Sequence, residues 1–161
     1  MRWAVIFVLG FLVIALPAQA GRQNARAALT IRLIVTPASS RFLIDHAPKA
    51  YPSKGDVLRE TSTLRNAVVQ FGRPKGAIVG RDTWITTIVI APFGTASVKS
   101  TTSVPGGTIR GAGAVNFANT ASTFRVLGGT GRYANARGTI SLRNLDANGK
   151  RGLSVYRLQL P

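Results

Sequence analysis

Short runs of β-branched and other apolar residues, separated by glycine, proline, asparagine and aspartate, dominate this chain after residue 28. Within most runs, apolar side chains recur at every second position, which is the periodicity of a half-buried strand. No stretch after the first 20 residues shows the 3.6-residue spacing of an amphipathic helix. The predicted strands cover residues 29–35, 56–71, 76–90, 96–104, 108–117, 123–127, 136–145 and 152–160.

Eight strands with short connections predict an all-β fold: a single eight-stranded, antiparallel, up-and-down β-barrel of the calycin-like kind. Closure of the sheet removes exposed edges and leaves a lumen that can hold side chains or one small ligand. Gly111 and Gly113 within one predicted strand indicate strong bending at a barrel corner. Alternation puts Ile109 and Val115 on the same face as these glycines, but it does not say which face lines the lumen.

The first 20 residues predict a secretory signal peptide. Arg2 provides a positive start, Trp3 to Leu16 form an apolar run, and Pro17 precedes the small residues Ala18 and Ala20. The run is shorter than the ~20 apolar residues of a spanning helix. We therefore expect cleavage after Ala20, a short polar leader at 21–28, a barrel domain at 29–161, and a secreted or periplasmic protein with no transmembrane segment after cleavage.

Composition narrows the classes of function. The 161 residues include no cysteine, which excludes disulfides, thiolate metal sites and a cysteine nucleophile. Lys and Arg number 21 against 5 acidic residues, for a formal net charge of +16. The basic residues are scattered and aromatic residues are few, so the pattern disfavours nucleic acid as a partner. A polyanion of the cell envelope is an alternative partner, and a merely solvated basic surface explains the charge equally well.

One segment, VLGGTGRYANARGT at 126–139, resembles the glycine-rich signature of dirigent proteins. GAIVGRD at 76–82 and PGGTIRG at 105–111 resemble further segments of that family, in the same order. The resemblance covers roughly residues 29–160 and is closest to the small secreted bacterial branch of the dirigent-like, allene-oxide-cyclase-barrel family. It implies a barrel of the allene-oxide-cyclase/dirigent type with a central pocket, assembled as a dimer or trimer.

The resemblance also implies candidate site residues. Arg137 matches an arginine that points toward the pocket in dirigent proteins, where it would anchor a phenolate or carboxylate; the alternative is an ion pair with Asp82 that stitches the barrel. Arg132 follows the turn where lignan-forming dirigent proteins place an acid, a departure that argues against acid-assisted steering. Tyr133 and Trp84 are candidate pocket walls, although aromatic residues in small barrels more often fill the core.

Other motifs indicate little chemistry. Asp82 is a pocket acid with a shifted pKa, a turn residue, or the partner of Arg81 or Arg137. His46 is the sole histidine, and Asp45 beside it would face the opposite way in a strand, so we expect neither a metal site nor a Ser-His-Asp nucleophile. The segment after Gly128–Gly131 looks like a strand, so these glycines indicate a tight turn rather than a phosphate loop.

Three hypotheses of function follow. Plant dirigent proteins steer the coupling of phenoxy radicals without oxidising them, so the resemblance favours a barrel that binds a small hydrophobic or phenolic molecule and orients it, without redox chemistry or a cofactor of its own. The pocket would include Arg137, Arg132, Tyr133, Asp82 and Trp84. One alternative is an isomerase of the cyclase kind that acts on an oxidised lipid, as the allene oxide cyclases imply. The other is a non-catalytic basic surface protein that binds an envelope polyanion.

Overall fold

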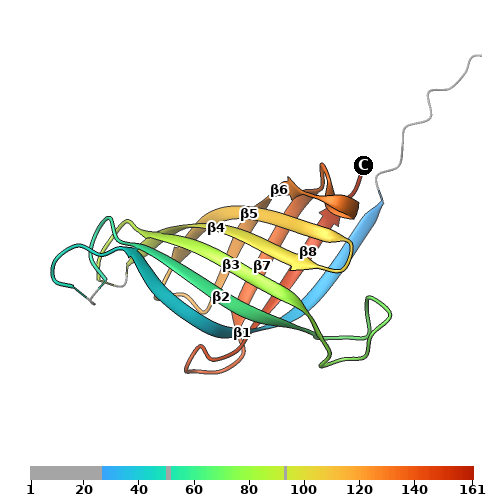
Figure 1. The fold of residues 1–161 in the computed structure, drawn as a ribbon, viewed down its shortest axis with the longest axis horizontal. Coiled ribbons are helices and arrows are strands. Elements are labelled where there is room, and N and C mark those ends of the chain that lie inside the picture. Colours follow the sequence, from blue (N-terminus) through green and yellow to red (C-terminus); the bar gives the residue numbers. More distant parts are fainter. Residues whose placement is uncertain (1–26, 50–51, 93) are drawn as a thin grey trace, which may run out of the picture.

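A closed, antiparallel barrel of eight strands forms the whole of the described structure (Figure 1). The computed structural model describes residues 27–49, 52–92 and 94–161, so the predicted signal peptide and most of the polar leader lie outside it. The strands are β1 (Ala28–Ile44), β2 (Val57–Asn66), β3 (Ile78–Ile88), β4 (Thr95–Val104), β5 (Gly107–Asn116), β6 (Ala121–Gly129), β7 (Arg137–Asn144) and β8 (Gly152–Gln159). Each strand pairs with its neighbour in sequence, and β1 pairs with β8 to close the barrel. The predicted fold class is therefore confirmed.

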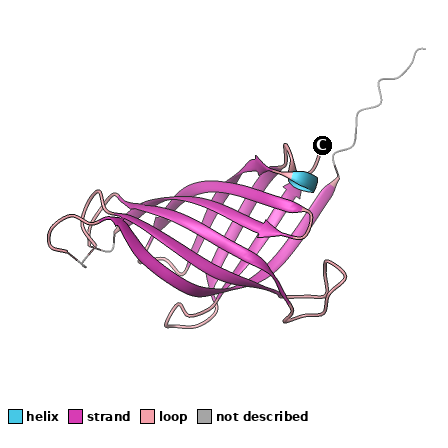
Figure 2. Cartoon of the chain, viewed as in Figure 1, coloured by secondary structure: helices cyan, strands magenta, loops and turns pink. Residues whose placement is uncertain are grey.

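The described residues contain very little helix. Figure 2 shows a single helical turn, η1 (Gly131–Tyr133), at the end of the barrel where the chain terminates. β6 ends at Gly129, and η1 begins two residues later, after Thr130. The sequence had suggested that a strand follows the glycine turn at once. Among the described residues, no helix is long and apolar enough to cross a membrane.

The first strand is much longer than predicted. β1 pairs with β8 from Ala28 to Val35 and with β2 from Leu33 to Ile44, with a register shift between Pro37 and Ser39. Pro37 suggested that the strand ends near residue 35, because proline cannot donate a ladder hydrogen bond. Pairing with β8 has already ended at that point, so one side of β1 is free of ladder bonds and tolerates a proline.

The second strand is shorter than predicted, because it ends at Asn66; the β2–β3 register shifts just before that residue, between Leu64 and Arg65. The buried Asn66 amide donates hydrogen bonds to the carbonyls of Gln70, Arg73 and Pro74 at 2.8–3.3 Å. These bonds satisfy carbonyl groups of the turn that leads to β3, which explains why a polar side chain is fully buried here.

The interior face of β5 contains Ile109, Gly111, Gly113 and Val115, which settles the question that alternation left open. A Cβ on Gly111 would lie 2.6 Å from Cδ1 of Ile140, and one on Gly113 would lie 2.7 Å from Cδ1 of Phe124. The two glycines therefore make room for large inward side chains of β6 and β7, in addition to any bending of the strand.

The barrel has a packed end and a hollow end. Most of the apolar core, including Leu33, Leu64, Ile109 and Val126, fills the end that carries the termini and η1. Tyr133 of η1 is fully buried there and donates a hydrogen bond to the Pro105 carbonyl at 2.8 Å. This tyrosine and the turns around it close that end of the lumen.

We predict that Gly129→Ala destabilises the barrel by ~2 kcal/mol or more, because the added Cβ would lie 1.9 Å from the Thr108 carbonyl oxygen and the backbone would have to shift. Gly72→Ala is the matched control: its φ is +65° but nothing lies within 4 Å of the added Cβ, so only ~1 kcal/mol is expected. Denaturant titration of both variants measures the difference, and equal losses would contradict this account of the turn.

Candidate functional site

A cavity of about 680 Å³ occupies the hollow end of the barrel. It opens among four connections, which we call the mouth loops: β1–β2 (45–56), β3–β4 (89–94), β5–β6 (117–120) and β7–β8 (145–151), of which residues 50, 51 and 93 are not described. The antiparallel order places all four at one end of the strands. The walls are mainly apolar and come from all eight strands, with Leu58, Ile88, Val98, Val115 and Leu142 among them.

A polar bridge crosses the lumen below this cavity. Thr102 of β4 donates a hydrogen bond to Asp82 Oδ1 at 3.0 Å, and its hydroxyl lies 2.9 Å from the Tyr156 hydroxyl. Asp82 and Thr102 are direct cross-strand partners, whereas Tyr156 reaches them from β8 on the other side of the barrel. All three side chains are essentially inaccessible to solvent. We call Asp82, Thr102 and Tyr156 the lumen bridge.

Burial sets the acidity of the lumen bridge. Desolvation raises the pKa of Asp82 to about 6, although hydrogen bonds from Trp84 and Thr102 favour its ionised form. Burial also raises the pKa of Tyr156, and the nearby Asp82 carboxylate adds to that effect. The tyrosine is therefore a neutral hydroxyl at ordinary pH, and Asp82 carries its charge above about pH 6.

Trp84 joins the lumen bridge to the cavity. Its Nε1 donates a hydrogen bond to Asp82 Oδ2 at 2.6 Å, and its ring lies edge-on to Phe124 with centroids 5.2 Å apart. These two contacts hold the indole in one orientation while part of it lines the cavity. An aromatic ring fixed in this way offers a preformed surface to an apolar or aromatic ligand.

Glu60 gives the cavity wall its acidic group. It lies directly opposite Trp84 in the β2–β3 register, and its Oε2 accepts a hydrogen bond from the Thr86 hydroxyl at 3.1 Å. Among the described residues that line the cavity, none is lysine or arginine. The cavity is therefore acidic in character, although the whole chain has a formal net charge of +16.

The structure brings together two of the five residues that the sequence suggested for the site. Trp84 lines the cavity, and Asp82 lies directly beneath it. Arg132, Tyr133 and Arg137 do not line it, because the glycine-rich turn that carries them lies at the packed end of the barrel. Tyr133 fills the core there, as the alternative interpretation proposed.

The expected position of Arg137 requires correction. Its side chain is exposed on the outer face of β7, and its Nη1 donates a hydrogen bond to the Ala136 carbonyl at 3.2 Å. Alternation along β7 explains this. Ile140 points inward, so residues 137 and 139, which have the opposite parity, point outward. Within the described residues Asp82 forms no ion pair, so the predicted pairing with Arg137 is absent as well.

Sequence reasoning did not identify Glu60, Thr86, Thr102 or Tyr156. Alternation shows which residues of a strand share a face with them. Nothing in the sequence says which face lines the lumen or which residues meet across it. Tyr156 alternates with Leu153 and Val155 along β8, and the structure shows that the Tyr156 face is the interior one. The serine and threonine residues carry no signal of their own until Asp82 is known to be buried beside them.

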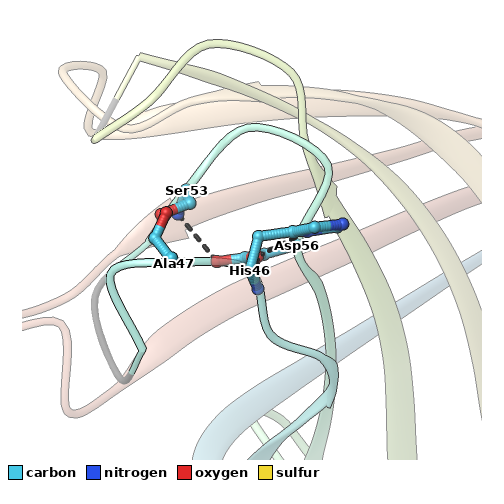
Figure 3. Close-up of polar contacts among 4 residues, drawn as sticks. All are labelled: His46, Ala47, Ser53 and Asp56. Atoms are coloured by element: carbon cyan, nitrogen blue, oxygen red, sulfur yellow. Dashed lines mark hydrogen bonds and ion pairs between the residues drawn. The ribbon is translucent and has the colours of Figure 1, made fainter.

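A compact cluster of polar contacts stabilises the β1–β2 mouth loop (Figure 3). The carboxylate of the buried Asp56 accepts hydrogen bonds from the backbone N–H groups of His46 and Ser53, both at 2.7 Å. His46 Nδ1 lies 3.0 Å from Asp56 Oδ1. These bonds lower the pKa of Asp56, the largest effect coming from the His46 backbone. The sequence had considered only the neighbouring Asp45 as a partner for His46. No group of metal-ligating side chains occurs among the described residues.

The structure is thus a closed eight-stranded barrel whose lumen holds an apolar cavity with a polar floor, the lumen bridge. No protein-family model matches the chain, and no curated protein matches its sequence. Solved structures do. Pyocyanin demethylase aligns over 81% of this chain and 100% of its own, at 20% identity and a TM-score of 0.63. A pterocarpan synthase dirigent protein aligns over 84% of both chains, at 15% identity and a TM-score of 0.65.

A Diels-Alderase from Streptomyces koyangensis is also similar, over 86% of this chain and 71% of its own, at 18% identity and a TM-score of 0.61. At these identities the likeness establishes the fold. The resemblance to the dirigent-like, allene-oxide-cyclase-barrel group that was drawn from the glycine-rich segment is thereby confirmed at the level of the fold. The residues of the site are this chain's own.

The raised pKa of Asp82 predicts a specific dependence of stability on pH. A carboxyl with a folded-state pKa of about 6 and an unfolded value near 3.8 binds its proton more tightly in the folded state, so the free energy of unfolding falls as pH rises between these values. Relative to Asp82→Asn, the wild-type protein should lose about 2 kcal/mol between pH 4 and 7.

Denaturant titration of both proteins across this range measures the difference, which removes every contribution that the two proteins share. Identical pH profiles for the two proteins would show that the Asp82 carboxyl is not a buried, ionising group.

Proposed function

We propose that the barrel binds a small, neutral, apolar or phenolic molecule in the cavity at its hollow end and orients it against Trp84, without redox chemistry of its own. The observation that carries this proposal is a cavity of about 680 Å³ with mainly apolar walls and a fixed indole beside a small set of polar groups. Ligand pockets of roughly 300–1,000 Å³ with this character are typical of small-molecule sites.

The polar groups are placed so that they fix a ligand's orientation. Glu60 and Thr86 lie on adjacent strands and already share a hydrogen bond, so a ligand hydroxyl would meet one acceptor and one hydroxyl at the same point of the wall. Trp84 stands directly opposite Glu60 and offers its ring to the ligand's apolar part. A phenol is a molecule of this kind, with one polar end and one aromatic face.

This arrangement holds a reactive molecule by position and by exclusion of water. Both are recognised contributions to the control of a reaction, and neither requires the protein to transfer a proton or an electron. The names of the similar structures include a dirigent protein and a Diels-Alderase, which supports the view that barrels of this shape host small organic molecules. Action outside the cytoplasm is part of the proposal and rests on the first 20 residues alone.

The same electrostatics weigh against the cyclase hypothesis in its original form. A cyclase for an oxidised fatty acid would need a cation to hold the substrate carboxylate, and Arg137 was the candidate. Arg137 lies outside the cavity, and the described lining contains the acidic side chain of Glu60 but no lysine or arginine. Burying an anion beside Glu60 without a counter-ion is costly, so the structure favours neutral ligands over fatty-acid anions.

Ligand binding has a built-in reporter. The chain has two tryptophans, Trp3 and Trp84, so the tryptophan fluorescence of a protein that starts at Gly21 comes from Trp84 alone. We predict saturable changes in its fluorescence with members of a panel of neutral phenols. Ser62→Phe, which places a large side chain in the cavity wall, should weaken this binding by ~10-fold or more, because it fills the space that the ligand needs.

Arg137→Ala is the control, because its side chain lies outside the cavity and its removal should leave the affinity unchanged within about twofold. A protein that binds no phenol, or one whose binding is lost in Arg137→Ala and kept in Ser62→Phe, would contradict the assignment of the site to the hollow end.

The acidic lining predicts a preference between two ligands of the same shape. Hydrocinnamyl alcohol should bind more tightly than hydrocinnamate by about fivefold or more at pH 7.5, because the carboxylate of the latter meets Glu60. Glu60→Gln should narrow that preference. Competition titration against a phenol that binds the wild-type protein measures both values. Tighter binding of the anion would instead favour an acid-anchoring, cyclase-like site.

A further inference from the structure

The apolar side chains left exposed by the fold gather around the cavity mouth. Six of the ten large hydrophobic residues that are exposed in the described structure lie in the mouth loops or on the strand end next to them. Three of the four mouth loops contribute at least one, and the end of β1 beside the fourth contributes two. We call this set the mouth crown: Leu43, Ile44, Val89, Ile90, Phe117 and Leu145.

Chance does not account well for this pattern, because the crown residues are far apart in sequence and meet only through the barrel topology. Leu43 and Ile44 end β1, whereas Leu145 follows β7. Ile90 and Ile44 are 57% and 50% exposed. Five other strands, β2, β5, β6, β7 and β8, end instead in asparagine, glycine or glutamine. Exposed apolar groups concentrated in one place mark a surface that contacts something apolar.

Cations lie on the outer wall just behind the crown. Arg41 and Arg59 are exposed cross-strand partners on β1 and β2, Lys99 is exposed on β4, and Arg143 precedes Leu145 by two residues. None of the five acids lies on the outward face of a strand: Glu60 and Asp82 face the lumen, and the other three lie in the mouth loops themselves.

The acids in the mouth loops are largely engaged. Asp56 is buried and bonded to His46 and Ser53, Asp146 accepts hydrogen bonds from the Lys150 backbone and from Arg151, and Asp45 also has an interaction partner. Exposed lysines, Lys49 and Lys54, lie in the same β1–β2 loop. The mouth end therefore presents apolar tips backed by positive charge.

We propose that the mouth crown docks this protein on the surface of an anionic phospholipid bilayer, with the cavity opening toward the lipid. Apolar side chains that enter the headgroup–acyl boundary, backed by lysine and arginine at the level of the headgroups, are the arrangement by which peripheral proteins bind anionic membranes. The long stems of arginine and lysine also allow the charge to stay among the phosphates while their methylenes cover apolar surface. In this orientation an apolar ligand passes between bilayer and cavity without crossing water.

This inference does not depend on the proposed ligand. It concerns the rim of the barrel, whereas ligand binding concerns the interior, and the two can be measured separately. Val69 and Ile78 provide matched controls, because they are 76% and 51% exposed but lie at the opposite end of the barrel, in and next to the β2–β3 connection.

Vesicle flotation tests the proposal with the chain from Gly21, because every strand and the whole core lie within residues 28–160 and because the apolar run at 3–16 would bind lipid by itself. We expect binding to vesicles of phosphatidylcholine with about 30% phosphatidylglycerol, weaker binding to phosphatidylcholine alone, and loss of binding as salt rises from about 0.05 to 0.5 M. Ile44→Glu with Ile90→Glu should weaken binding to the anionic vesicles by about tenfold or more. Val69→Glu with Ile78→Glu should change it by less than about twofold.

Three results would overturn the proposal. The wild-type protein could fail to bind anionic vesicles, or the two double variants could lose binding equally. Alternatively, sedimentation velocity could show that the wild-type protein self-associates in solution and that Ile44→Glu with Ile90→Glu makes it monomeric, in which case the crown covers a second copy of the chain. Val89→Glu with Leu145→Glu is a second crown variant if the first does not fold. Unchanged Trp84 fluorescence and unchanged phenol binding without vesicles show that the variants keep the barrel and its cavity.

Discussion

The hydrogen-bonded bridge of Asp82, Thr102 and Tyr156 is the feature on which the rest of this barrel depends. A carboxyl and two hydroxyls placed inside an apolar lumen would be costly if they were unpaired, so each must find its partner across the barrel. The bridge divides the lumen: the buried apolar core packs on one side, and the cavity lies on the other. It also fixes Trp84, since Asp82 accepts the indole N–H. Structural and functional roles therefore meet at one buried acid.

The two ends of the barrel carry different tasks. The glycine-rich turn and Tyr133 close one end, where a Cβ on Gly129 or Gly131 would collide with a facing backbone carbonyl. This requirement explains why the segment is so recognisable in sequence: it specifies a tight junction of the fold. The cavity and the mouth crown lie at the other end, on loops with no comparable motif. The strongest sequence signal and the candidate site are thus at opposite ends of one molecule.

The outer and inner faces of the barrel sheet carry charges of opposite sign. Outward positions on the strands carry the arginines, whereas Glu60 and Asp82 face the lumen. A chain with a net charge of +16 therefore encloses a cavity without a lysine or arginine among its described lining residues. The overall charge describes how the protein meets large partners, and the two inward acids describe what the cavity accepts. Composition alone merges these two properties, because it does not separate the faces of a strand.

The sequence by itself determined the fold class, the number of strands and most of their bounds, because period-two alternation and glycine or proline turns are local signals. It also singled out Asp82, one of only five acids, and Trp84, one of two tryptophans. The tertiary structure alone decided which face is interior, that Arg137 points outward, and that Glu60, Thr102 and Tyr156 join the site. These facts arise from pairing between strands and from closure of the barrel, which bring together residues as distant as Thr102 and Tyr156. No pattern within a single strand contains that information.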